Sequence, residues 1–510
     1  MPSIIVYACK WNPSIAADNA GVEKRSIPDD MRIITVECTG SLTTAMLIQP
    51  FEEGARGVLV LGCSAGECHF VNGNEFAKTR VEEAKSILKW LGHRSESLEI
   101  NLMSDTSGAA FEDIVNRFAS RINRLQITEM IEQTNAEYCL ECGVCTGICP
   151  MSRINKSFSP RIIVEDCLLS LESEILSSDI IWTCLTCKTC EEVCPSKVNF
   201  TDFIRQLRDK AADSGAHMAL THAGILQQTR LLEAKEPRKK TFEWLNCEKK
   251  SLDTDIAYFA GCAPVYDIVF KYLDLKITDS TNAILNLLRL AGINPALSPD
   301  EVCCGHDAYW NGELDVFKRL ARHNLEWIKK GNYKTVIFGC PEGYHTFKNI
   351  YPRELGESSL EVLFWTDIIM ENKYALIPDI DNHETVSVTY QDPCRLGRYS
   401  GIYESPRDLL TLFENVKLKE MQKNRETSIC CGSSGWVQCT SCNKSIQMSR
   451  LDDAKETEAE IMLTACPKCL IHLRCAQKDT NEQSVKLMDL ASFVYSLCKI
   501  SKKNEVLYAR

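Results

Sequence analysis

Long apolar runs are missing from this sequence. Its 510 residues contain no hydrophobic stretch of about 18 residues or more, the length that a membrane-spanning helix needs, so no transmembrane segment is expected. The opening residues, MPSIIVYACKWNPS, also lack a basic start and a small-residue cleavage site. They therefore predict a first β-strand rather than a signal peptide, and a cytoplasmic location.

Basic clusters and two common cofactor motifs are missing as well. The chain has 69 acidic and 58 basic residues and a net charge of −11, and no basic cluster is interleaved with aromatic residues. This composition argues against a nucleic-acid partner. There is no C-x-x-C-H motif for attached haem. A G-x-G-x-x-G nucleotide loop is also absent, despite the nearby Gly62, Gly66 and Gly73.

Cysteine is the residue that the chain has in excess, with 27 copies. Many of them lie in C-x-x-C steps, which are too close in sequence for disulfides that close long loops, and no export signal is present. Reduced thiols at such spacings favour metal binding, either as structural zinc or as iron–sulfur clusters. The spacing of the cysteines has to distinguish these two kinds of site.

One cysteine motif occurs twice in the first half of the chain. Residues 139–150 read CLECGVCTGICP and residues 184–195 read CLTCKTCEEVCP, both spaced C-x2-C-x2-C-x3-C-P. In such a pair the fourth cysteine of each copy binds the other cluster, whereas zinc sites usually use two separated pairs of ligands. The spacing assigns one 4Fe–4S cubane cluster to Cys139, Cys142, Cys145 and Cys194, and a second to Cys184, Cys187, Cys190 and Cys149. The segment resembles a two-cluster ferredoxin domain, expected at residues 126–245, mainly helical and with a helical insert at roughly residues 160–178.

Strand and helix patterns alternate through residues 1–104. The runs IIVYAC, RIITVEC and GVLVLGC predict parallel β-strands, and residues 41–54 and 74–92 predict helices. Each strand is expected to end in a cysteine, with one more cysteine shortly after the third: Cys9, Cys38, Cys63 and Cys68. Because the carboxyl ends of strands line the ligand crevice of an open α/β sheet, these cysteines favour a 2Fe–2S site. Buried structural cysteines are the alternative interpretation.

The segments around these four cysteines are similar to a known family. YACKWNP, ECTGSL and GCSAGECHFVNGN resemble the delta (iron–sulfur) subunit of methyl-viologen-reducing hydrogenase, with matching segments from residue 3 to residue 125. The resemblance implies a domain at residues 1–125 that binds one 2Fe–2S cluster. It also implies an electron relay between a hydrogenase or formate dehydrogenase and a flavin-containing heterodisulfide reductase subunit.

Beyond a charged stretch that ends near residue 245, the chain repeats itself. The first copy contains AYFAGC, EVCCG and TVIFGCPEGYHTF, and the second contains VTYQDPC, SICCG and MLTACPKCLIHL. Between the first cysteine and the Cys-Cys pair lie 40 residues in the first copy and 35 in the second. Each copy predicts the order strand, Cys, helix, Cys-Cys-Gly, helix, strand, Cys. Vicinal cysteines suit a cluster in which neighbouring thiolates reach different irons.

This half resembles the cysteine-rich (CCG) domains of heterodisulfide reductase, which bind noncubane 4Fe–4S clusters through five cysteines. The second copy, expected at residues 380–510, has a full set that would carry the catalysis: Cys394, Cys430, Cys431, Cys466 and Cys469. The first copy, expected at residues 250–375, has four: Cys262, Cys303, Cys304 and Cys340. Its last element reads Cys-Pro-Glu-Gly343, so the fifth cysteine is missing. It is predicted to hold a different cluster, another metal or nothing, which makes one or two noncubane clusters in total.

Several further residues near these motifs have two interpretations each. An extra C-x-x-C, Cys439 and Cys442, is either a turn or a further metal or redox site. His306 and His345 are either substitute ligands or ordinary core or surface residues. Four cations flank the second-copy cysteines, either to hold anionic substrate groups or as solvated surface: Arg395, Arg398, Lys468 and Arg474. Four cysteines have no partner pattern and are expected to be packed: Cys167, Cys247, Cys475 and Cys498.

Together these patterns predict an α/β and α+β multidomain protein that carries electrons. The order of a ferredoxin domain and two CCG domains is that of a heterodisulfide reductase catalytic subunit. The leading hypothesis is an iron–sulfur oxidoreductase subunit that passes electrons from a hydrogenase, formate dehydrogenase or flavoprotein to a noncubane cluster. There a small-molecule disulfide is reduced, which in methanogenesis is the coenzyme M–coenzyme B heterodisulfide. The alternatives are a non-catalytic conduit of a flavin-linked glycolate, lactate or glycerol-3-phosphate dehydrogenase complex, and a zinc-binding scaffold.

Overall fold

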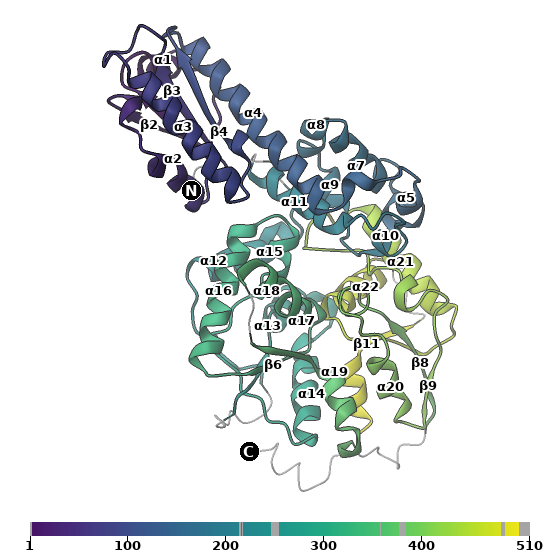
Figure 1. Cartoon of the computed structure of the whole chain (residues 1–510). Helices are drawn as coiled ribbons and strands as arrows, with labels where there is room; N and C mark the ends of the chain where they lie inside the picture. Colours follow the sequence, from purple (N-terminus) through teal and green to yellow (C-terminus); the bar gives the residue numbers. More distant parts are fainter. Residues whose placement is uncertain are drawn as a thin grey trace. The chain divides into compact units, whose positions relative to one another are not determined.

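The computed structural model describes residues 3–213, 216, 218–245, 254–356, 359–376, 384–480 and 485–498 (Figure 1). The chain divides into two compact units, Met1–Gln133 and Thr134–Arg510. None of the helices in the described ranges is long and apolar enough to span a membrane. Parallel α/β sheets in both units, and a helical region at the start of the second, confirm the predicted α/β multidomain class.

A four-stranded parallel sheet forms the centre of the first unit. Its strands lie in the order β2-β1-β3-β4: β1 (Ile4–Cys9), β2 (Met31–Val36), β3 (Gly57–Cys63) and β4 (Leu98–Met103). The central strands β1 and β3 are buried along their whole length, as their unbroken apolar, β-branched sequences require. Cys9 and Cys63 therefore lie side by side at the carboxyl ends of neighbouring strands.

Helices cover both faces of this sheet. α1 (Asn12–Val22) and α4 (Gly108–Gln133) share an apolar core with one face, whereas α2 (Thr44–Glu52) and α3 (Gly73–Trp90) share a core with the other. α2 begins after Thr43, whose hydroxyl accepts the backbone N–H of Met46 at 3.3 Å. The three predicted strands and both predicted helices are confirmed, and β4 and α4 complete the layers.

The second unit begins with short helices around the two repeated cysteine motifs. They are α5 (Val144–Ile148), α6 (Pro150–Ile154), α7 (Pro160–Leu168), α8 (Glu172–Leu176), α9 (Ile180–Thr183), α10 (Thr189–Glu192), α11 (Phe200–Asp213) and α12 (Ile225–Lys235). α7 begins with a proline after Ser159, whose hydroxyl accepts the N–H of Ile162 at 3.3 Å. Because α7 and α8 lie between the motifs, the predicted helical insert is confirmed.

Two parallel sheets follow, one in each copy of the repeat. The first has the order β5-β6-β7: β5 (Ile256–Phe259), β6 (Thr335–Phe338) and β7 (Glu361–Phe364). The second has the order β11-β10-β8-β9: β8 (Val386–Gln391), β9 (Val416–Leu418), β10 (Ile461–Thr464) and β11 (Lys486–Asp489). In both copies the strand that precedes the last cysteine element pairs with the strand that precedes the first cysteine. The predicted repeat is therefore a structural repeat.

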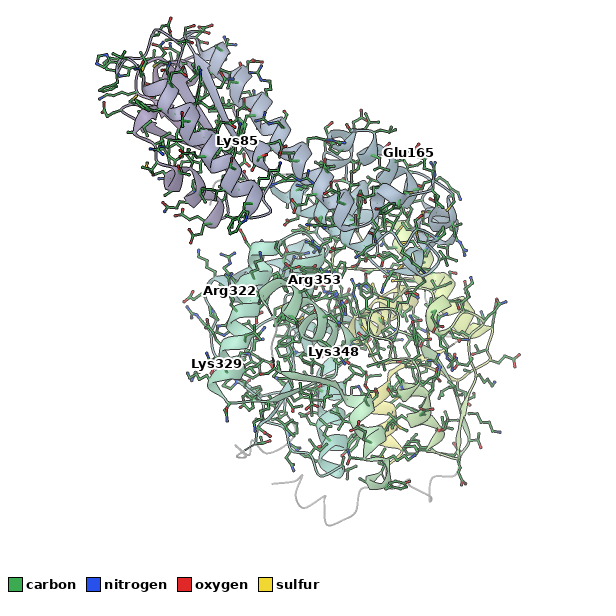
Figure 2. All side chains as sticks on the ribbon, in the orientation of Figure 1. Lys85, Glu165, Arg322, Lys329, Lys348 and Arg353 are labelled. Carbon is green, nitrogen blue, oxygen red and sulfur yellow. The ribbon has the colours of Figure 1, made fainter. Side chains whose placement is uncertain are left out.

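Helices join the two sheets around one shared apolar core. The first copy has α13 (Ala263–Val269), α14 (Ile277–Leu290), α15 (His306–Trp310), α16 (Leu314–Lys330), α17 (Pro341–His345), α18 (Tyr351–Leu355) and α19 (Trp365–Glu371). The second has α20 (Ser405–Thr411), α21 (Ser441–Lys455), α22 (Pro467–Thr480) and α23 (Leu490–Ser496). α14 packs against α23, and α19 against α20, so the core belongs to both copies. On α16 the apolar side faces this core, while Arg322 and Lys329 are exposed (Figure 2).

Candidate iron–sulfur sites

Four thiols gather at the carboxyl edge of the sheet in the first unit. The Sγ atoms of Cys9 and Cys63 lie 3.6 Å apart. Cys38 and Cys68 form a second pair, because their thiols are hydrogen-bonded to each other. Two pairs of thiols match the ligand pattern of two irons that each take two thiolates, which is the pattern expected for a 2Fe–2S cluster.

The position of Cys38 differs from the prediction in one detail. β2 ends at Val36, so Cys38 lies two residues past the strand instead of ending it. There its Sγ accepts the backbone N–H of Gly40 at 3.4 Å and caps a short 3-10 helix. A single turn thus brings the thiol back to the edge where the strands end. Gly73 is required beside it, because a Cβ at this position would collide with the Sγ of Cys38.

The two ferredoxin-type motifs line two neighbouring cavities. The first is lined by Cys139, Cys142, Cys145 and Cys194, and also by Cys190. The second is lined by Cys149, Cys184, Cys187 and Cys190. We call these the outer and the inner cavity, because Cys142 is exposed in the first whereas Cys184, Cys187 and Cys190 are buried. In both, the fourth cysteine of one motif joins three of the other, as the spacing predicts.

The five cysteines of the second CCG copy form a continuous chain of thiols. Neighbouring thiols interact in the order Cys394, Cys430, Cys431, Cys469 and Cys466. The series extends to the inner cavity, because the thiol of Cys187 also interacts with that of Cys430. This interaction and the positive charge of Arg398 lower the pKa of Cys187. The inner cavity and the second-copy set are therefore direct neighbours.

Two buried arginines fasten the inner cysteine loop to the second copy. Arg395 donates to the carbonyl of Thr186 at 2.9 Å and to its hydroxyl at 2.7 Å, and the guanidinium lies between the rings of Trp310 and Tyr399. Arg398 donates to the carbonyl of Cys187 at 2.6 Å. These side chains are structural clamps in the described structure and not solvated surface, which decides against one of the two sequence-based interpretations.

The first CCG copy lines a cavity as well. All four of its predicted cysteines contribute: Cys262, Cys303, Cys304 and Cys340. The Sγ atoms of Cys262 and Cys303 lie 4.0 Å apart. The structure therefore also brings the four cysteines of the first copy together, although that copy lacks a fifth.

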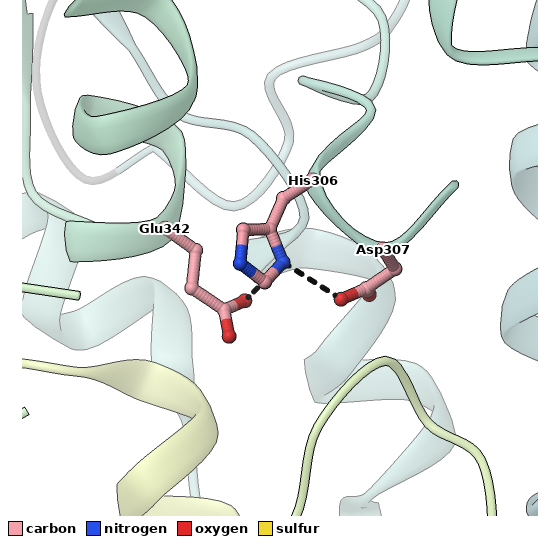
Figure 3. Close-up of side chains that lie close together, drawn as sticks. All are labelled: His306, Asp307 and Glu342. Carbon is pink, nitrogen blue, oxygen red and sulfur yellow. Dashed lines mark hydrogen bonds and ion pairs between the residues drawn. The ribbon is translucent and has the colours of Figure 1, made fainter. Parts of the chain in front are cut away.

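A buried charged network closes this cavity on the side of the second copy. Nε2 of His306 accepts the N–H of Arg395 at 2.9 Å, so the proton is on Nδ1, which lies 2.9 Å from Asp307 and 3.4 Å from Glu342 (Figure 3). Lys468 pairs with both carboxylates, at 2.6 and 2.7 Å. The ring nitrogen of His306 and the carboxylates of Asp307 and Glu342 converge as the ligands of a metal ion would. The ammonium of Lys468 already supplies the positive charge between the two carboxylates. His306 is therefore a core residue of an ion-pair network.

The spacing of the sulfurs tests zinc against clusters. Tetrahedral zinc with Zn–S bonds of about 2.3 Å holds its sulfurs about 3.8 Å apart. Within the described ranges, the group of three or more ligand atoms that converge within 4.8 Å consists of His306, Asp307 and Glu342, without any cysteine. The cysteine sets are thus too wide for one zinc ion, and they fit a cofactor that spreads its thiolate ligands over several irons.

Two buried nitrogens without hydrogen-bond partners indicate that a multi-iron cofactor also fits the cysteine set of the second copy. Nη2 of Arg398 and Nε2 of His472 are buried without a hydrogen-bond partner among the described residues. Both side chains interact electrostatically with second-copy thiols. Buried polar nitrogens usually have partners, and the sulfides of a bound cluster would supply acceptors here. Burial lowers the pKa of His472 to about 4, so the ring is neutral near pH 7.

Burial also changes the thiols themselves. It raises the pKa of Cys184 to about 12 and that of Cys63 to about 11. Free thiolates are therefore disfavoured at these positions, and metal binding has to compensate for the loss of the protons. The cysteines suit a bound cofactor better than an empty anionic pocket.

The remaining candidate residues lie outside these sets. Cys439 is exposed on the turn before α21, and Cys442 is half-buried in the first turn of that helix. Cys167 and Cys498 are buried as predicted, whereas Cys475 is half-buried with Lys444 3.4 Å from its Sγ. Cys247 lies outside the described residues. His345 is buried against Tyr399, and Arg474 donates to the carbonyl of Leu273 at 3.3 Å.

Arg208 is a structural residue of this region that the sequence patterns did not predict. It is fully buried and donates to the carbonyls of Ile181, Cys184 and Trp310 at 3.0, 2.7 and 2.8 Å. It thereby joins the inner loop to the first CCG copy. Its helix is strongly amphipathic, and an arginine among the buried positions of that pattern was the available signal.

Family comparisons agree with this division of the chain. Residues 4–126 match the family "Methyl-viologen-reducing hydrogenase, delta subunit", residues 135–198 match a 4Fe-4S dicluster domain, and residues 256–348 and 388–474 match the cysteine-rich domain. The chain therefore contains a hydrogenase-delta domain, a dicluster ferredoxin domain and two CCG domains.

Curated relatives place these domains in a functional class. The chain is 28% identical over 400 residues to one subunit of dihydromethanophenazine:CoB–CoM heterodisulfide reductase from Methanosarcina barkeri, covering 71% of this chain and 94% of that protein. It is 26% identical to the probable iron–sulfur-binding oxidoreductase FadF of Bacillus subtilis, covering 70% and 59%. The EtfAB:quinone oxidoreductase of Syntrophomonas wolfei is also 26% identical, with 70% and 57% covered. Over about 70% of its length the chain is therefore similar to iron–sulfur oxidoreductase subunits, among them a heterodisulfide reductase subunit.

Proposed function

We propose that this chain is the disulfide-reducing subunit of a larger electron-transfer complex. Electrons would come from a hydrogenase, a formate dehydrogenase or a flavin-containing heterodisulfide reductase subunit. The acceptor would be a small-molecule disulfide, of which the CoB–CoM heterodisulfide in the name of the Methanosarcina relative is one candidate. The hydrogenase-delta domain would bind a 2Fe–2S cluster and receive the electrons from the partner.

The observation that carries this proposal is the contact between Cys187 and Cys430. Both thiols are buried and interact with each other, and Arg398 joins the carbonyl of Cys187 at 2.6 Å to that of Ser428 at 2.8 Å. The inner ferredoxin set therefore adjoins the five-cysteine set of the second copy. A conduit that ended at a ferredoxin domain would have no need of this junction. When bound, the clusters supply reversible one-electron chemistry and irons with an affinity for sulfur.

The chain's own residues have defined tasks in this proposal. Arg395 and Arg398 hold the inner loop against the second copy through backbone carbonyls, so the two cysteine sets keep a fixed separation. The buried Nη2 of Arg398 is available to donate to sulfur near Cys430. Lys468 lies between Cys466 and Cys469 in sequence, and its ammonium stays charged in the buried network with Asp307. These cations offset the negative charge that accumulates when electrons and thiolates are added.

The test uses the full chain, reconstituted anaerobically with iron and sulfide. Reduced viologen should be oxidised when a small disulfide is added, with two thiols formed per disulfide. Cys431→Ala should abolish this activity and leave the EPR signals of both ferredoxin-type clusters. Cys439→Ala is the matched control, since Cys439 is exposed and outside every set, and it should retain the activity. Retention of full activity in Cys431→Ala would refute the assignment.

A second candidate is a non-catalytic conduit between a flavoprotein and quinone. The similarity to EtfAB:quinone oxidoreductase favours it. In that case no disulfide would be reduced although all clusters are present, and a reduced flavoprotein partner would transfer electrons through the chain to a quinone analogue.

A further inference from the structure

The two CCG copies differ at two residues of their last cysteine element, and the second of these differences leaves the first copy without a fifth cysteine. The first copy reads Cys340-Pro341-Glu342-Gly343, and the second reads Cys466-Pro467-Lys468-Cys469. Both elements follow the equivalent strands β6 and β10 and begin a helix. Gly343 thus stands where the second copy has its fifth cysteine, whose thiol is hydrogen-bonded to Cys431 and Cys466.

A second difference occurs where the missing thiol would point. A Cβ built on Gly343 would lie 3.1 Å from the ring of Phe338, the last residue of β6. The equivalent last residue of β10 is Thr464, whose small side chain accepts the N–H of Cys466 at 3.3 Å. The larger ring therefore fills space that the second copy leaves for Cys469, so the loss of the cysteine and the gain of the phenylalanine compensate each other in volume.

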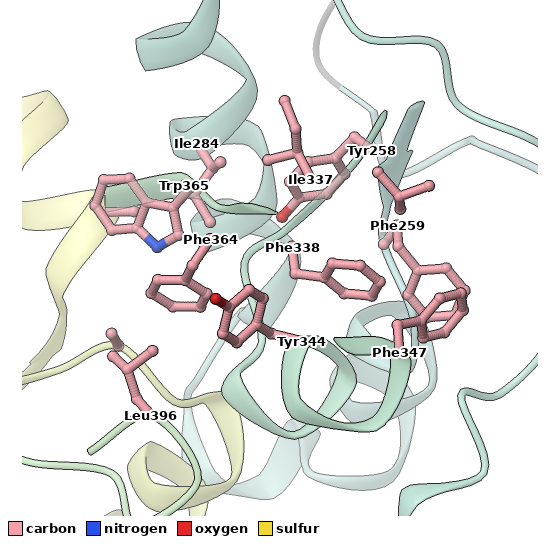
Figure 4. Close-up of a cluster of buried hydrophobic side chains, with 14 of the residues drawn as sticks. Tyr258, Phe259, Ile284, Ile337, Phe338, Tyr344, Phe347, Phe364, Trp365 and Leu396 are labelled. Atoms are coloured by element: carbon pink, nitrogen blue, oxygen red, sulfur yellow. The ribbon is translucent and has the colours of Figure 1, made fainter. Parts of the chain in front are cut away.

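Phe338 is also fixed in this position by its neighbours. Its ring lies 5.3 Å from Phe259 and 4.8 Å from Phe347, and it is fully buried (Figure 4). In the second copy, Gln391 and Leu473 occupy the places that correspond to Phe259 and Phe347. The first copy thus has an aromatic wall where the second has a partly polar one, so the two sites differ at several corresponding positions and not only at the missing cysteine.

The four thiols of the first copy line one cavity. No three of them converge closely enough for a single zinc ion within the part of the chain that is described. The cavity therefore has the donor set for a multi-iron cofactor, with one thiolate for each of four irons.

We propose that the first CCG copy binds a four-iron cluster of the cubane class through Cys262, Cys303, Cys304 and Cys340, and that only the second copy binds a five-thiolate noncubane cluster. This inference rests on the proposed function in that it assumes iron–sulfur assembly, but it does not depend on disulfide reduction. A cluster with all four irons ligated by protein has no free position for a substrate sulfur. The first copy is then an electron carrier, and sulfur chemistry is confined to the second.

The test replaces Phe338 and Gly343 with the residues at the equivalent positions of the second copy, and the reverse, in the full chain reconstituted with ⁵⁷Fe. Phe338→Thr/Gly343→Cys should convert one cubane-type Mössbauer component into a second noncubane-type component at unchanged iron content. The reciprocal control, Thr464→Phe/Cys469→Gly, should remove the noncubane component and add a cubane-type one. Unchanged spectra in a folded Phe338→Thr/Gly343→Cys protein would overturn the proposal.

A conservative variant covers the case in which the exchanged proteins do not fold. Cys304→Ser removes one thiolate with almost no change in volume. It should lower the iron content by up to four atoms per chain and remove one cubane-type EPR signal, while the noncubane component stays. An unchanged iron content, or loss of a noncubane signal instead, would refute the inference. Because these readouts count irons and not thiols released, they remain decisive even if no disulfide is reduced.

Discussion

Replacing Arg208 with methionine should destabilise the second unit strongly. Methionine keeps most of the side-chain volume but leaves the carbonyls of Ile181, Cys184 and Trp310 buried without their donor. Each buried acceptor that loses its partner costs about 1–3 kcal/mol, and removal of the buried charge returns part of this. The net loss should be about 3–5 kcal/mol, or a fall in apparent Tm of about 4–6 °C for a unit of this size.

The assay is anaerobic thermal unfolding of the reconstituted protein, at one scan rate for all variants because cluster loss makes unfolding irreversible. Arg238→Met is the matched control, since the side chain of Arg238 is 78% exposed and its ion pair with Glu236 is a surface pair. It should change the Tm by less than about 1 °C. If Arg208→Met has the same Tm as the Arg238→Met control, Arg208 does not join the inner loop to the first CCG copy in the way described.

Three further substitutions test other parts of the structure. Gly73→Ala should abolish the visible and EPR signals of the proposed 2Fe–2S site and spare those of the other proposed clusters, because its Cβ displaces the Sγ of Cys38. Gly21→Ala, whose Cβ meets no atom within 4 Å, should leave every signal in place. Lys468→Met should lower the free energy of unfolding in urea by about 3–5 kcal/mol, since two carboxylates remain buried without their cation; a loss below about 1 kcal/mol would contradict this. Val71→Gly should raise the Tm slightly or leave it unchanged, because this exposed residue has a φ of 68° that costs a β-branched side chain about 1–2 kcal/mol; a clear fall in Tm would mean that its side chain makes a stabilising contact.

The sequence was sufficient to predict the elements of the first unit. β1 and β3 are unbroken apolar runs that only a doubly covered parallel sheet can bury, and α2 and α3 have clear helical patterns. The end of β2 was predicted two residues too far, because the run continues through Cys38 although the chain turns after Val36. Such an end depends on local hydrogen bonds and not on hydrophobic pattern.

The junction between the cysteine sets was beyond sequence reasoning. The contact between Thr186 and Arg395 joins residues 209 positions apart, and neither has a pattern that identifies its partner. The arginines near the second-copy cysteines were noted as candidates, but whether they face solvent, substrate or backbone depends on the packing of the two copies. The contact of Phe338 with the position of the missing cysteine could not be predicted either, because it is recognised only when the last residues of β6 and β10 are compared in the structure.

The clamp on the inner loop has a consequence for how the protein is made. Cys184, Cys187 and Cys190 are each only 8% exposed, and the loop between them is held by side chains of the last CCG copy. If the inner site holds a cluster as proposed, a cluster-delivery protein would reach these thiols only before that copy has folded over them, whereas the outer site keeps the exposed Cys142. The inner site would then be loaded first, while the C-terminal copy is still being synthesised or is still open.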